Sequence, residues 1–419
     1  MKKLLPKASR DRHTLYLFAA IGLVALFARI AAYTYLPPER ISDAAIYDAV
    51  ARNLIAGNGY SINGIDPTME RPPTYPVFLA LVYALSGGTT SAVLIVQAIL
   101  GVATTFMTGW LATRLFDRRV GYLAAFLVAT YPALIYYDTR LLREGFTGFL
   151  LIGTLCLSWL ARAGRPWQLL LVGFALACLS MCRPETLVVF IPTVLIVSRL
   201  DLKPTRIARP ASYILLPILF VWLPWTARNY TTFGTLSPIR AGIASTVWFG
   251  NRWAATGGDD QASQDRAHLK ESFQSKALGA TEGELDGRFK DEIADDLLSR
   301  PLWFVEMVGK KAVMYWKDAN GVRRTLPRIH PSLPILLNTY YYGLLALAVF
   351  SAWIGRSSIS IRTLLYTILI YWATYALLHV RNRYRVPILP IVFILSASSL
   401  TYITGEIRRL AGLRDSTTS

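Results

Sequence analysis

An acidic segment follows directly on the first long apolar run of the chain. The stretch "ISDAAIYDAV" at residues 41–50 carries Asp43 and Asp48, and it comes after the apolar run of residues 15–36. A carboxylate at such a place can act as a general base on a hydroxyl group. Asp43 can instead cap a helix, together with Ser42, because acidic and hydroxyl side chains stabilise helix N-termini. Both interpretations of Asp43 remain open.

The residues after Asp43 predict a short amphipathic helix. Apolar residues recur at helical spacing as far as Leu54, so Asp43 and Tyr47 lie at the start of a helix along the membrane surface. The helix would hold a carboxylate next to the membrane, and Tyr47 becomes a candidate substrate-binding residue. Asp48 lies off the apolar face, and we expect it to be solvated.

Two further charged residues stand at the starts of apolar runs. Arg71, in "ERPPTYP", precedes a proline-rich first helical turn, a stiff position from which an arginine can point at a phosphate. Its alternative role is an interfacial anchor. Glu144, in "LLREGFTGF", lies at the mouth of an apolar run, where a charge is costly unless it is paired or solvated, which indicates a functional acid. The alternative for Glu144 is a salt bridge to Arg143 or another arginine.

Arginines gather late in the chain and at one earlier turn. The stretch "RNRYRVP" carries Arg381, Arg383 and Arg385, and "CRPE" carries Arg183 beside Glu185. The topology derived below places these cations on the outer face, against the usual bias, which a protein tolerates more readily if they bind an anionic ligand. Together with a carboxylate, such cations suit transfer from a lipid phosphate: the acid deprotonates the acceptor and the arginines stabilise the departing phosphate.

The composition identifies a membrane protein. The 419 residues are 53% hydrophobic and 17% charged, and the mean hydropathy is +0.38, above what a soluble domain carries. The net charge of +18 comes from basic residues in short loops between apolar runs, which is typical of cytoplasmic loops and argues against nucleic-acid binding. The three cysteines lie inside apolar runs and lack the spacing of a metal site or a disulfide framework. We therefore expect them to be core residues: Cys156, Cys178 and Cys182.

The charge distribution sets the expected topology. Eleven apolar runs are long enough to consider, but if all eleven cross, three basic loops fall outside, against the positive-inside bias. The weakest run, 73–86, is nearer to an interfacial segment than to a span. Without it the chain has ten spans, beginning with a retained first span, and both termini are cytoplasmic. The outer face then receives residues 37–90, 138–144, 182–185, 228–332 and 379–385.

We therefore expect an all-α polytopic membrane protein in three parts. Within the long loop, Thr281 and Glu284 form a capping pattern ahead of helix-period apolar residues, which predicts one or two helices near the outer surface. The parts are a transmembrane catalytic module at 1–227 with juxtamembrane helices at about 42–56 and 73–86, an outer loop with amphipathic helices at 228–332, and C-terminal transmembrane helices with a cytoplasmic tail at 333–419.

The ordered set of motifs resembles a known family. An acid after the first span within a "D…Y…A..L..G.GY" pattern precedes "RPPTYPVFLAL", "LLREGFTGFLL", "MCRPETLVVF", "LPWTARNYTTFG", "WFGN" and "RYRVPILPIVFIL". This set, over residues 15–404, resembles the integral-membrane C-type glycosyltransferases, in particular protein O-mannosyltransferases and lipid A aminoarabinose transferases. The resemblance implies two juxtamembrane helices after the first span, a polyprenyl-phosphate sugar donor and inversion at the anomeric carbon.

The resemblance also implies roles for particular residues. Asp43 matches the first-loop catalytic aspartate, Glu144 the second-loop acid and Arg71 the residue that contacts the donor phosphate. Arg383 and Arg385 match a more variable region, and with Arg183 they complete the expected phosphate-binding set; Tyr384 joins Tyr47 as a substrate-binding candidate. Many members have an Asp-Glu pair in the first loop, whereas Ala44 follows Asp43 here, which weakens an assignment to the protein O-mannosyltransferases.

The expected function is transfer of a sugar to a lipid, glycan or protein acceptor on the outer, periplasmic face of a bacterial inner membrane. A flippase or transporter of such a lipid, or a polysaccharide polymerase or ligase, remains an alternative. A transporter should show charges at mid-depth of the membrane, whereas these acids and arginines lie at span ends. No ligand cluster argues for a metal and no other cofactor is expected, but metal dependence differs within the superfamily, so a divalent metal stays open.

Overall fold

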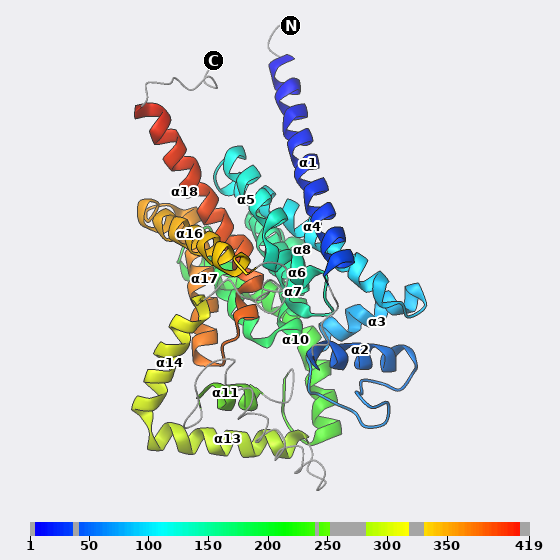
Figure 1. The fold of residues 1–419 in the computed structure, drawn as a ribbon. Coiled ribbons are helices and arrows are strands. Elements are labelled where there is room, and N and C mark those ends of the chain that lie inside the picture. Colours follow the sequence, from blue (N-terminus) through cyan, green and yellow to red (C-terminus); the bar gives the residue numbers. More distant parts are fainter. Residues whose placement is uncertain (1–4, 37–41, 239–242, 252–281, 318–330, 411–419) are drawn as a thin grey trace.

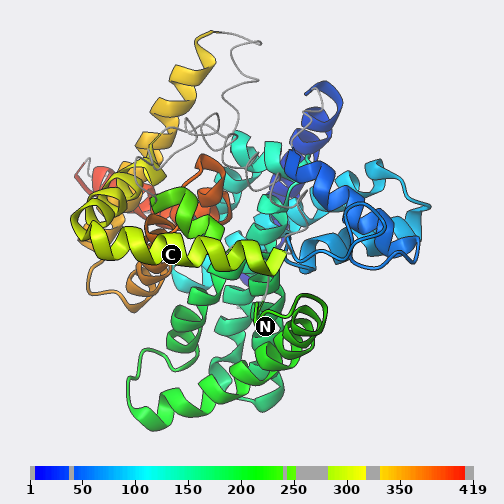
Figure 2. The same ribbon diagram turned by 90° about the horizontal axis from the view of Figure 1, so that it is seen from below.

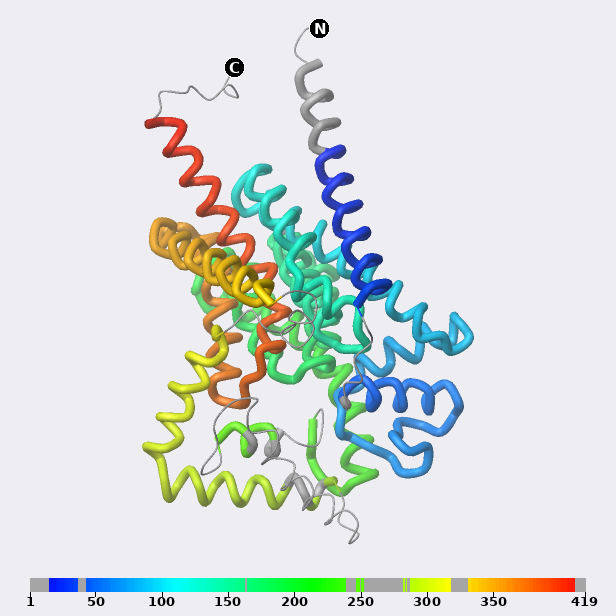
Figure 3. The backbone as a smooth tube through the Cα atoms, in the orientation of Figure 1, coloured from blue at the N-terminus to red at the C-terminus, as the bar shows by residue number. Residues whose placement is uncertain are grey.

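The computed structural model describes residues 5–36, 42–238, 243–251, 282–317 and 331–410. These residues form α-helices and short 3-10 helices, and their only extended pairing is an isolated antiparallel bridge between Ser61 and Pro67. The expected all-helical fold class is thereby confirmed for the part of the chain that the structure describes. Figure 3 traces the path of the backbone through this bundle.

The first half of the chain supplies most of the bundle. Figure 1 shows α2 lying across the direction of α1, with α3 beside it. Three prolines lie inside the long helix α10. The elements in order are α1 Leu5–Tyr35, α2 Ser42–Ile55, α3 Thr74–Ser86, α4 Thr90–Leu115, α5 Arg118–Thr130, α6 Pro132–Asp138, α7 Arg143–Leu160, η1 Ala161–Ala163, α8 Pro166–Cys182, η2 Pro184–Val189, α9 Phe190–Val197 and α10 Pro204–Phe233.

The second half adds helices at one end of the bundle and completes its core. Figure 2, a view from below, shows α13 lying across that end. The elements are α11 Ile243–Asn251, α13 Glu282–Ser299, α14 Pro301–Trp316, α16 Leu333–Ile354, α17 Ile359–Leu377, η4 Asn382–Ile388 and α18 Leu389–Leu410. The helices expected in the long loop are therefore present as α13 and α14, whereas Thr281 of the expected capping pattern lies outside the described residues.

Local sequence explains where several helices end. α3 stops at Gly87, which has φ 67° and leads into Gly88 with φ 83°, a left-handed conformation that glycine adopts without strain. Pro132 begins α6 immediately after α5, and the two helices form a pair bent by 58°. The apolar run 120–137, expected as one span, is thus a broken element.

Among the residues that the structure describes, length and composition identify five helices that can cross a membrane, or six if the bent α5–α6 pair counts as one span. The five are Leu15–Tyr35, Thr90–Leu115, Pro204–Phe233, Leu333–Ile354 and Asn382–Leu410. The run 184–198, expected to span, begins instead as the 3-10 segment η2 and continues as the eight-residue helix α9. The count of ten spans stays a prediction.

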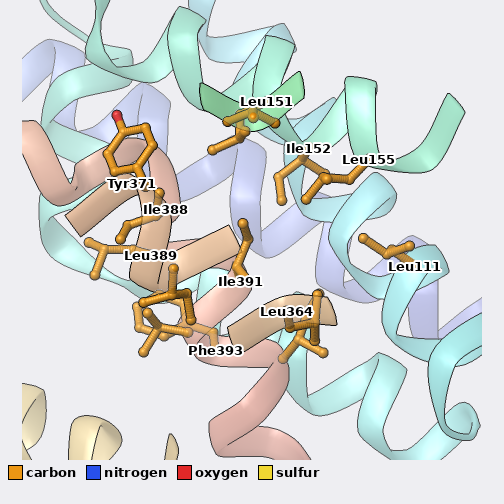
Figure 4. Packing of buried hydrophobic residues seen from close by; sticks show 14 of the residues in the cluster. Leu111, Leu151, Ile152, Leu155, Leu364, Tyr371, Ile388, Leu389, Ile391 and Phe393 are labelled. Carbon is orange, nitrogen blue, oxygen red and sulfur yellow. The ribbon is translucent and has the colours of Figure 1, made fainter. Parts of the chain in front are cut away.

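A large apolar core joins α4, α5, α7, α8 and α18. Figure 4 shows part of it, including Leu151 and Ile152 of α7 facing Ile391 of α18. The helices α4 and α5 approach closely because Gly109 and Gly121 face one another, and a Cβ on Gly121 would overlap with Thr113. In contrast, large apolar side chains on α1 and α10 are exposed, as expected of surfaces that contact lipid.

Candidate active site

Asp43 is held between two arginines at the N-terminus of α2. Arg71 Nη2 donates to Asp43 Oδ1 over 2.8 Å, and Arg383 Nη2 donates to the other carboxylate oxygen. The Asp43 side chain retains 19% exposure. Burial alone raises the pKa of the Asp43 carboxyl, but the guanidinium groups of Arg383 and Arg71 outweigh burial and hold this pKa well below its usual range. Asp43 is therefore ionised, and it is more than a helix cap.

Arg383 also connects Asp43 to the second candidate acid. Arg383 Nε lies 3.5 Å from Glu144 Oε1, in the first turn of α7, and the Glu144 side chain is only 2% exposed. Glu144 Oε2 is buried and has no hydrogen-bond partner among the described residues. Arg143 instead donates to the backbone oxygen of Cys182 over 2.8 Å. The partner of Glu144 is thus the distant arginine and not its neighbour in sequence.

The loop before α3 positions Arg71. Tyr60 donates from its hydroxyl to the backbone oxygen of Arg71 over 2.9 Å, and Arg228 of α10 donates to the backbone oxygen of Thr68 over 2.9 Å. Glu282, at the start of α13, accepts hydrogen bonds from the Thr68 hydroxyl and from the Met69 backbone, each over 2.9 Å. Elements more than 150 residues away in sequence therefore fix the loop that presents Arg71.

A buried lysine fastens the segment that leads to Arg383. Lys311 of α14 is fully buried and donates to Asn251 Oδ1 over 2.5 Å. Its ammonium also donates to the backbone oxygens of Leu377 and Leu378, over 3.1 and 2.9 Å, at the C-terminus of α17. These bonds tie α11 and α14 to the few residues that precede η4. The sequence analysis did not identify Lys311, and it included Asn251 only as the last residue of the motif "WFGN".

Arg183 is a buried cation without a hydrogen-bond partner among the described residues. The side chain is fully buried, and all three guanidinium nitrogens are unpaired. The guanidinium lies 4.3 Å from the ring centroid of Tyr384, and that of Arg383 lies 5.9 Å from the same centroid. Tyr384 therefore has the guanidinium groups of Arg183 and Arg383 near its ring, which brings Arg183 next to the acid–arginine cluster of Asp43, Arg71, Glu144 and Arg383.

Tyr47 and Arg385 have mainly packing contacts. Tyr47 is 2% exposed and packs edge-on against Tyr75 at 4.9 Å, while the Arg71 guanidinium lies 5.9 Å from its ring. Arg385 donates to the backbone oxygens of Tyr315 and Lys317, over 2.6 and 3.0 Å, so it caps the end of α14. The structure thus places Tyr47 beneath Arg71, whereas Arg385 does not contact either acid of the cluster.

The sequence analysis expected Asp48 to be solvated, but in the structure it is hydrogen-bonded to neighbouring side chains. It accepts a hydrogen bond from Arg52 Nε over 2.9 Å and another from the Tyr83 hydroxyl of α3. Arg52 also donates to the backbone oxygen of Gly88 over 3.2 Å and to the Thr90 hydroxyl over 3.2 Å. Asp48 therefore links α2 to α3 and α4, because its side of the helix faces α3 and not open solvent.

A second ion pair that the sequence analysis missed lies inside the bundle. Arg29 of α1 contacts Asp138, at the end of α6, through Nε at 2.8 Å and Nη2 at 2.7 Å, and both side chains are almost fully buried. Gly101 and Gly145 make room for this pair, since a Cβ on either glycine would overlap with the Asp138 carboxylate. The available signal was the single arginine that interrupts the first apolar run.

The acid–arginine cluster and Arg183 bring together three cations and two carboxylates. The surplus of positive charge and the unpaired nitrogens of Arg183 suit an anionic group such as a phosphate. Among the described residues no three His, Cys, Asp or Glu side chains are grouped to hold a metal ion. Asp43 and Glu144 are separated by Arg383, which both contact, so they do not form a metal site in this arrangement.

Comparison with known proteins found a family model that matches part of the chain. Residues 70–227 match the family model PMT_2, described as dolichyl-phosphate-mannose-protein mannosyltransferase. The matched segment contains Arg71, Glu144 and Arg183 but neither Asp43 nor Arg383. None of the curated proteins matches the chain in sequence.

Among solved structures, the archaeal oligosaccharyltransferase AglB from Archaeoglobus fulgidus, bound to an inhibitory peptide and a dolichol-phosphate, matches 98% of this chain with a TM-score of 0.56 and 14% identity. An oligosaccharyltransferase from Archaeoglobus fulgidus tethered to an acceptor peptide with the NVT sequon matches 96% of this chain with a TM-score of 0.56 and 15% identity. The chain spans 52% of the length of these enzymes. The match to ArnT from Cupriavidus metallidurans, bound to undecaprenyl phosphate, includes 95% of this chain and 79% of the ArnT chain, with a TM-score of 0.41 and 13% identity.

The two oligosaccharyltransferase matches agree with the all-helical architecture. Residues 70–227 carry the sequence pattern of the dolichyl-phosphate-mannose-protein mannosyltransferase family, and the chain has the multi-pass C-type glycosyltransferase fold that the archaeal oligosaccharyltransferase also has.

Proposed function

We propose that this protein transfers a sugar from a polyprenyl-phosphate carrier to an acceptor, with inversion at the anomeric carbon. The observation that carries the proposal is Arg383, which contacts both Asp43 and Glu144 while Arg71 contacts Asp43 from the other side. Arginines in such surroundings bind a phosphate, and a carboxylate beside them is placed to take a proton. The AglB structure with bound dolichol-phosphate supports a carrier of this class.

Asp43 serves as the general base in this proposal. It takes the proton of the acceptor hydroxyl or amine, the acceptor atom bonds to the anomeric carbon, and the bond from that carbon to the phosphate oxygen breaks. An inverting transfer needs one base opposite the leaving group, unlike a retaining one with a carboxylate nucleophile. A donor phosphate that draws Arg71 and Arg383 toward itself would weaken their hold on Asp43, so the pKa of Asp43 would rise and its basicity increase.

The arginines bind the phosphate and stabilise the charge that develops as it leaves. Arg71, Arg383 and Arg183 lie at or beside the cluster, and the unpaired Arg183 supplies donors without breaking an existing bond. Glu144 orients Arg383 from the buried side, and Tyr47 and Tyr384 pack against Arg71 and Arg183. Arg385 does not contact the donor phosphate in this proposal; it helps to position η4 through its hydrogen bond to the backbone oxygen of Tyr315. The proposal involves no metal step.

We propose further that the site faces the outer, periplasmic side of a bacterial inner membrane. The basic loops between spans support this orientation, because they would lie in the cytoplasm. The sugar is a hexose or pentose unit, and the acceptor is a lipid, a glycan or a protein of the cell envelope.

The test is complementation of a deletion strain, read out by mass spectrometry of surface glycans, glycolipids and glycoproteins. Wild-type protein should restore a single missing sugar, which names both donor and acceptor. Asp43→Asn keeps the shape and much of the capping ability of aspartate but removes its basicity. We expect turnover of the purified variant to fall by roughly 10² to 10⁴, the usual contribution of general base catalysis.

Asp48→Asn is the matched control for this variant. It is the same change five residues along the same helix, and Asp48 contacts Arg52 and Tyr83 but no member of the cluster. It should cost stability without lowering the turnover of folded protein. Near-normal turnover of folded Asp43→Asn would mean that Asp43 is not the base, and Glu144 would be the next candidate.

A transporter of the polyprenyl-linked sugar is a second candidate, favoured by the Arg29–Asp138 pair inside the bundle. Arg29 lies six residues, or about 9 Å, before the end of the span Leu15–Tyr35 but only four residues, or about 6 Å, from its middle, so the pair lies nearer to mid-depth than to the membrane surface. Flipping of labelled lipid in vesicles without sugar transfer would support the transporter.

A further inference from the structure

A groove lies at the other end of the bundle from the acid–arginine cluster. Its apolar wall includes Leu111 of α4, Leu155 of α7 and Leu364 of α17, which Figure 4 shows around the same side of the core. Arg162 and Arg199 stand among its lining residues. The groove contains about 410 Å³ of space, counting its open mouth. None of the residues placed in the proposed transfer reaction lines it.

Helix directions show how far the groove is from the transfer site. Glu144 is in the first turn of α7, whereas Trp159, which lines the groove, is fifteen residues later and so about 22 Å along the helix. α17 runs from Ile359, at the groove, to Leu377, where Lys311 binds its C-terminus. The two sites therefore face opposite ends of the bundle.

Two arginines lie at the rim of the groove. Arg162 stacks on the indole of Trp159 at 4.1 Å, and its buried Nε has no hydrogen-bond partner among the described residues. Arg199 Nη2 lies 3.4 Å from the backbone oxygen of Arg162. Burial and the neighbouring charge of Arg199 both lower the pKa of Arg162. Asp201, two residues beyond Arg199, pairs instead with Arg206 at 3.9 Å.

The backbone holds Arg199 at this rim in an unfavourable conformation. Arg199 and Leu200 both have φ of 58°, in the left-handed region that residues with a Cβ adopt at a cost. The turn is closed by a hydrogen bond of 2.9 Å from the Leu200 backbone to Leu195. Arg199 and Leu200 are thus held in a costly backbone conformation that places the Arg199 cation near Arg162. Backbone strain of this kind is typical of binding sites, and two neighbouring cations suit an anionic ligand.

We propose that the groove binds an anionic phospholipid, with its phosphate between Arg162 and Arg199 and one acyl chain along the leucine-lined wall. The phosphate supplies the negative charge that the arginine pair lacks, and basic pockets between membrane helices are suited to such headgroups. This lipid site is separate from the donor site and does not depend on the proposed transfer reaction.

The experiment measures lipid binding to delipidated, detergent-purified protein by native mass spectrometry, with the thermal midpoint as a second readout. Wild-type protein should bind phosphatidylglycerol at least about tenfold more tightly than phosphatidylcholine, because two arginines contact the charged headgroup. Phosphatidylglycerol should raise the thermal midpoint, whereas inorganic phosphate at the same concentration should not.

The variant Arg162→Gln/Arg199→Gln should lose the preference for phosphatidylglycerol. The control Arg209→Gln/Arg356→Gln removes the same charge from two exposed arginines that do not line the groove, and it should keep the preference. Arg199→Gln alone, at an exposed residue, provides a variant that folds if the double variant does not. The proposal is overturned if the groove variants keep the preference, if both lipids bind equally well, or if inorganic phosphate alone reproduces the stabilisation.

Discussion

At the scale of single residues, Arg71 contacts Asp43 through Nη2, and its Nε has no hydrogen-bond partner among the described residues. Its Nη2 reaches Asp43 at 2.8 Å and Glu70 at 3.4 Å, while its Nε is buried. An arginine in this arrangement can donate to a phosphate and to Asp43 at the same time. The same geometry explains why a lysine, with one compact charge, would be an incomplete substitute.

We therefore expect Arg71→Ala to weaken use of the lipid donor more than Arg71→Lys does. Loss of a charged hydrogen bond costs about 1.5–3 kcal/mol, so the alanine variant should lose roughly 10- to 150-fold in kcat/KM for the donor. Lysine keeps the charge and should lose less. Donor saturation kinetics on the purified variants decide this.

Arg52→Ala is the matched control, since Arg52 is an exposed arginine on the neighbouring helix α2 and pairs with Asp48. It should leave donor kinetics close to wild type. If both Arg71 variants also behave like wild type, Arg71 is only an interfacial anchor.

At the scale of elements, α14 positions η4 through the buried Lys311, in addition to the hydrogen bonds that Arg385 of η4 donates to the end of α14. Lys311 satisfies Asn251 Oδ1 and two backbone oxygens at the end of α17, only a few residues before Arg383. Lys311→Met keeps the length of the side chain but removes the donor to Asn251 Oδ1, at about 1–3 kcal/mol, while the backbone oxygens of Leu377 and Leu378 keep their hydrogen bonds from Asn251 Nδ2. We expect a lower thermal midpoint and a lower kcat, because the segment that carries Arg383 loosens.

Lys310→Met is the control, because the neighbouring lysine is 48% exposed and pairs with Glu306 on the surface of α14. It should change neither quantity. Equal effects of the two substitutions would show that the charge of α14, and not the buried contact, is what matters.

The Arg29–Asp138 pair fastens α1 to α6, and we expect its disruption to destabilise the fold without altering the transfer site. Asp138→Asn leaves a buried arginine without its counter-ion, which typically costs about 3–5 kcal/mol. Replacing both partners, as in Arg29→Met/Asp138→Leu, should recover much of this loss. The measurements are the thermal midpoint and the turnover of the folded fraction.

A wild-type thermal midpoint for Asp138→Asn would contradict the structural role of the pair. A lower turnover per folded molecule in the double variant would place the pair in the reaction instead.

Sequence patterns predicted local elements well and long-range pairings poorly. The helices expected at 42–56 and 73–86 are present as α2 and α3. The helical spacing of apolar residues predicted α2, and Pro73 and Gly87 mark the two ends of α3. Asp43 and Glu144 were identified by charge and position, but their connection through Arg383 depends on the packing of η4 against α7. Arg29 and Asp138 are 109 residues apart, and no local pattern links them.

At the scale of the whole molecule, charge separates the two ends of the bundle. The first turns of α1 and the last turns of α18 lie at the same end in Figure 1, whereas α13 lies at the other. The basic loops at 114–119, 162–166 and 198–209 adjoin the groove, which is at the end opposite the acid–arginine cluster. By the positive-inside bias we expect the groove in the cytoplasmic half of the membrane and the cluster at the outer face.

The orientation depends on whether residues 73–86 cross the membrane. α3 has 13 residues, and so is about 20 Å long, which is short for a hydrocarbon core of about 30 Å. We predict that α3 does not cross, so that a cysteine at Thr89 is labelled by an impermeant reagent from outside and one at Ser357 only from inside.

Both residues are exposed, and Thr89 avoids the left-handed backbone of Gly88. The background is a protein with its three native cysteines replaced, two of which are buried and one partly exposed. Labelling at Thr89 only from the cytoplasm, or at Ser357 only from outside, would show that the expected orientation is wrong.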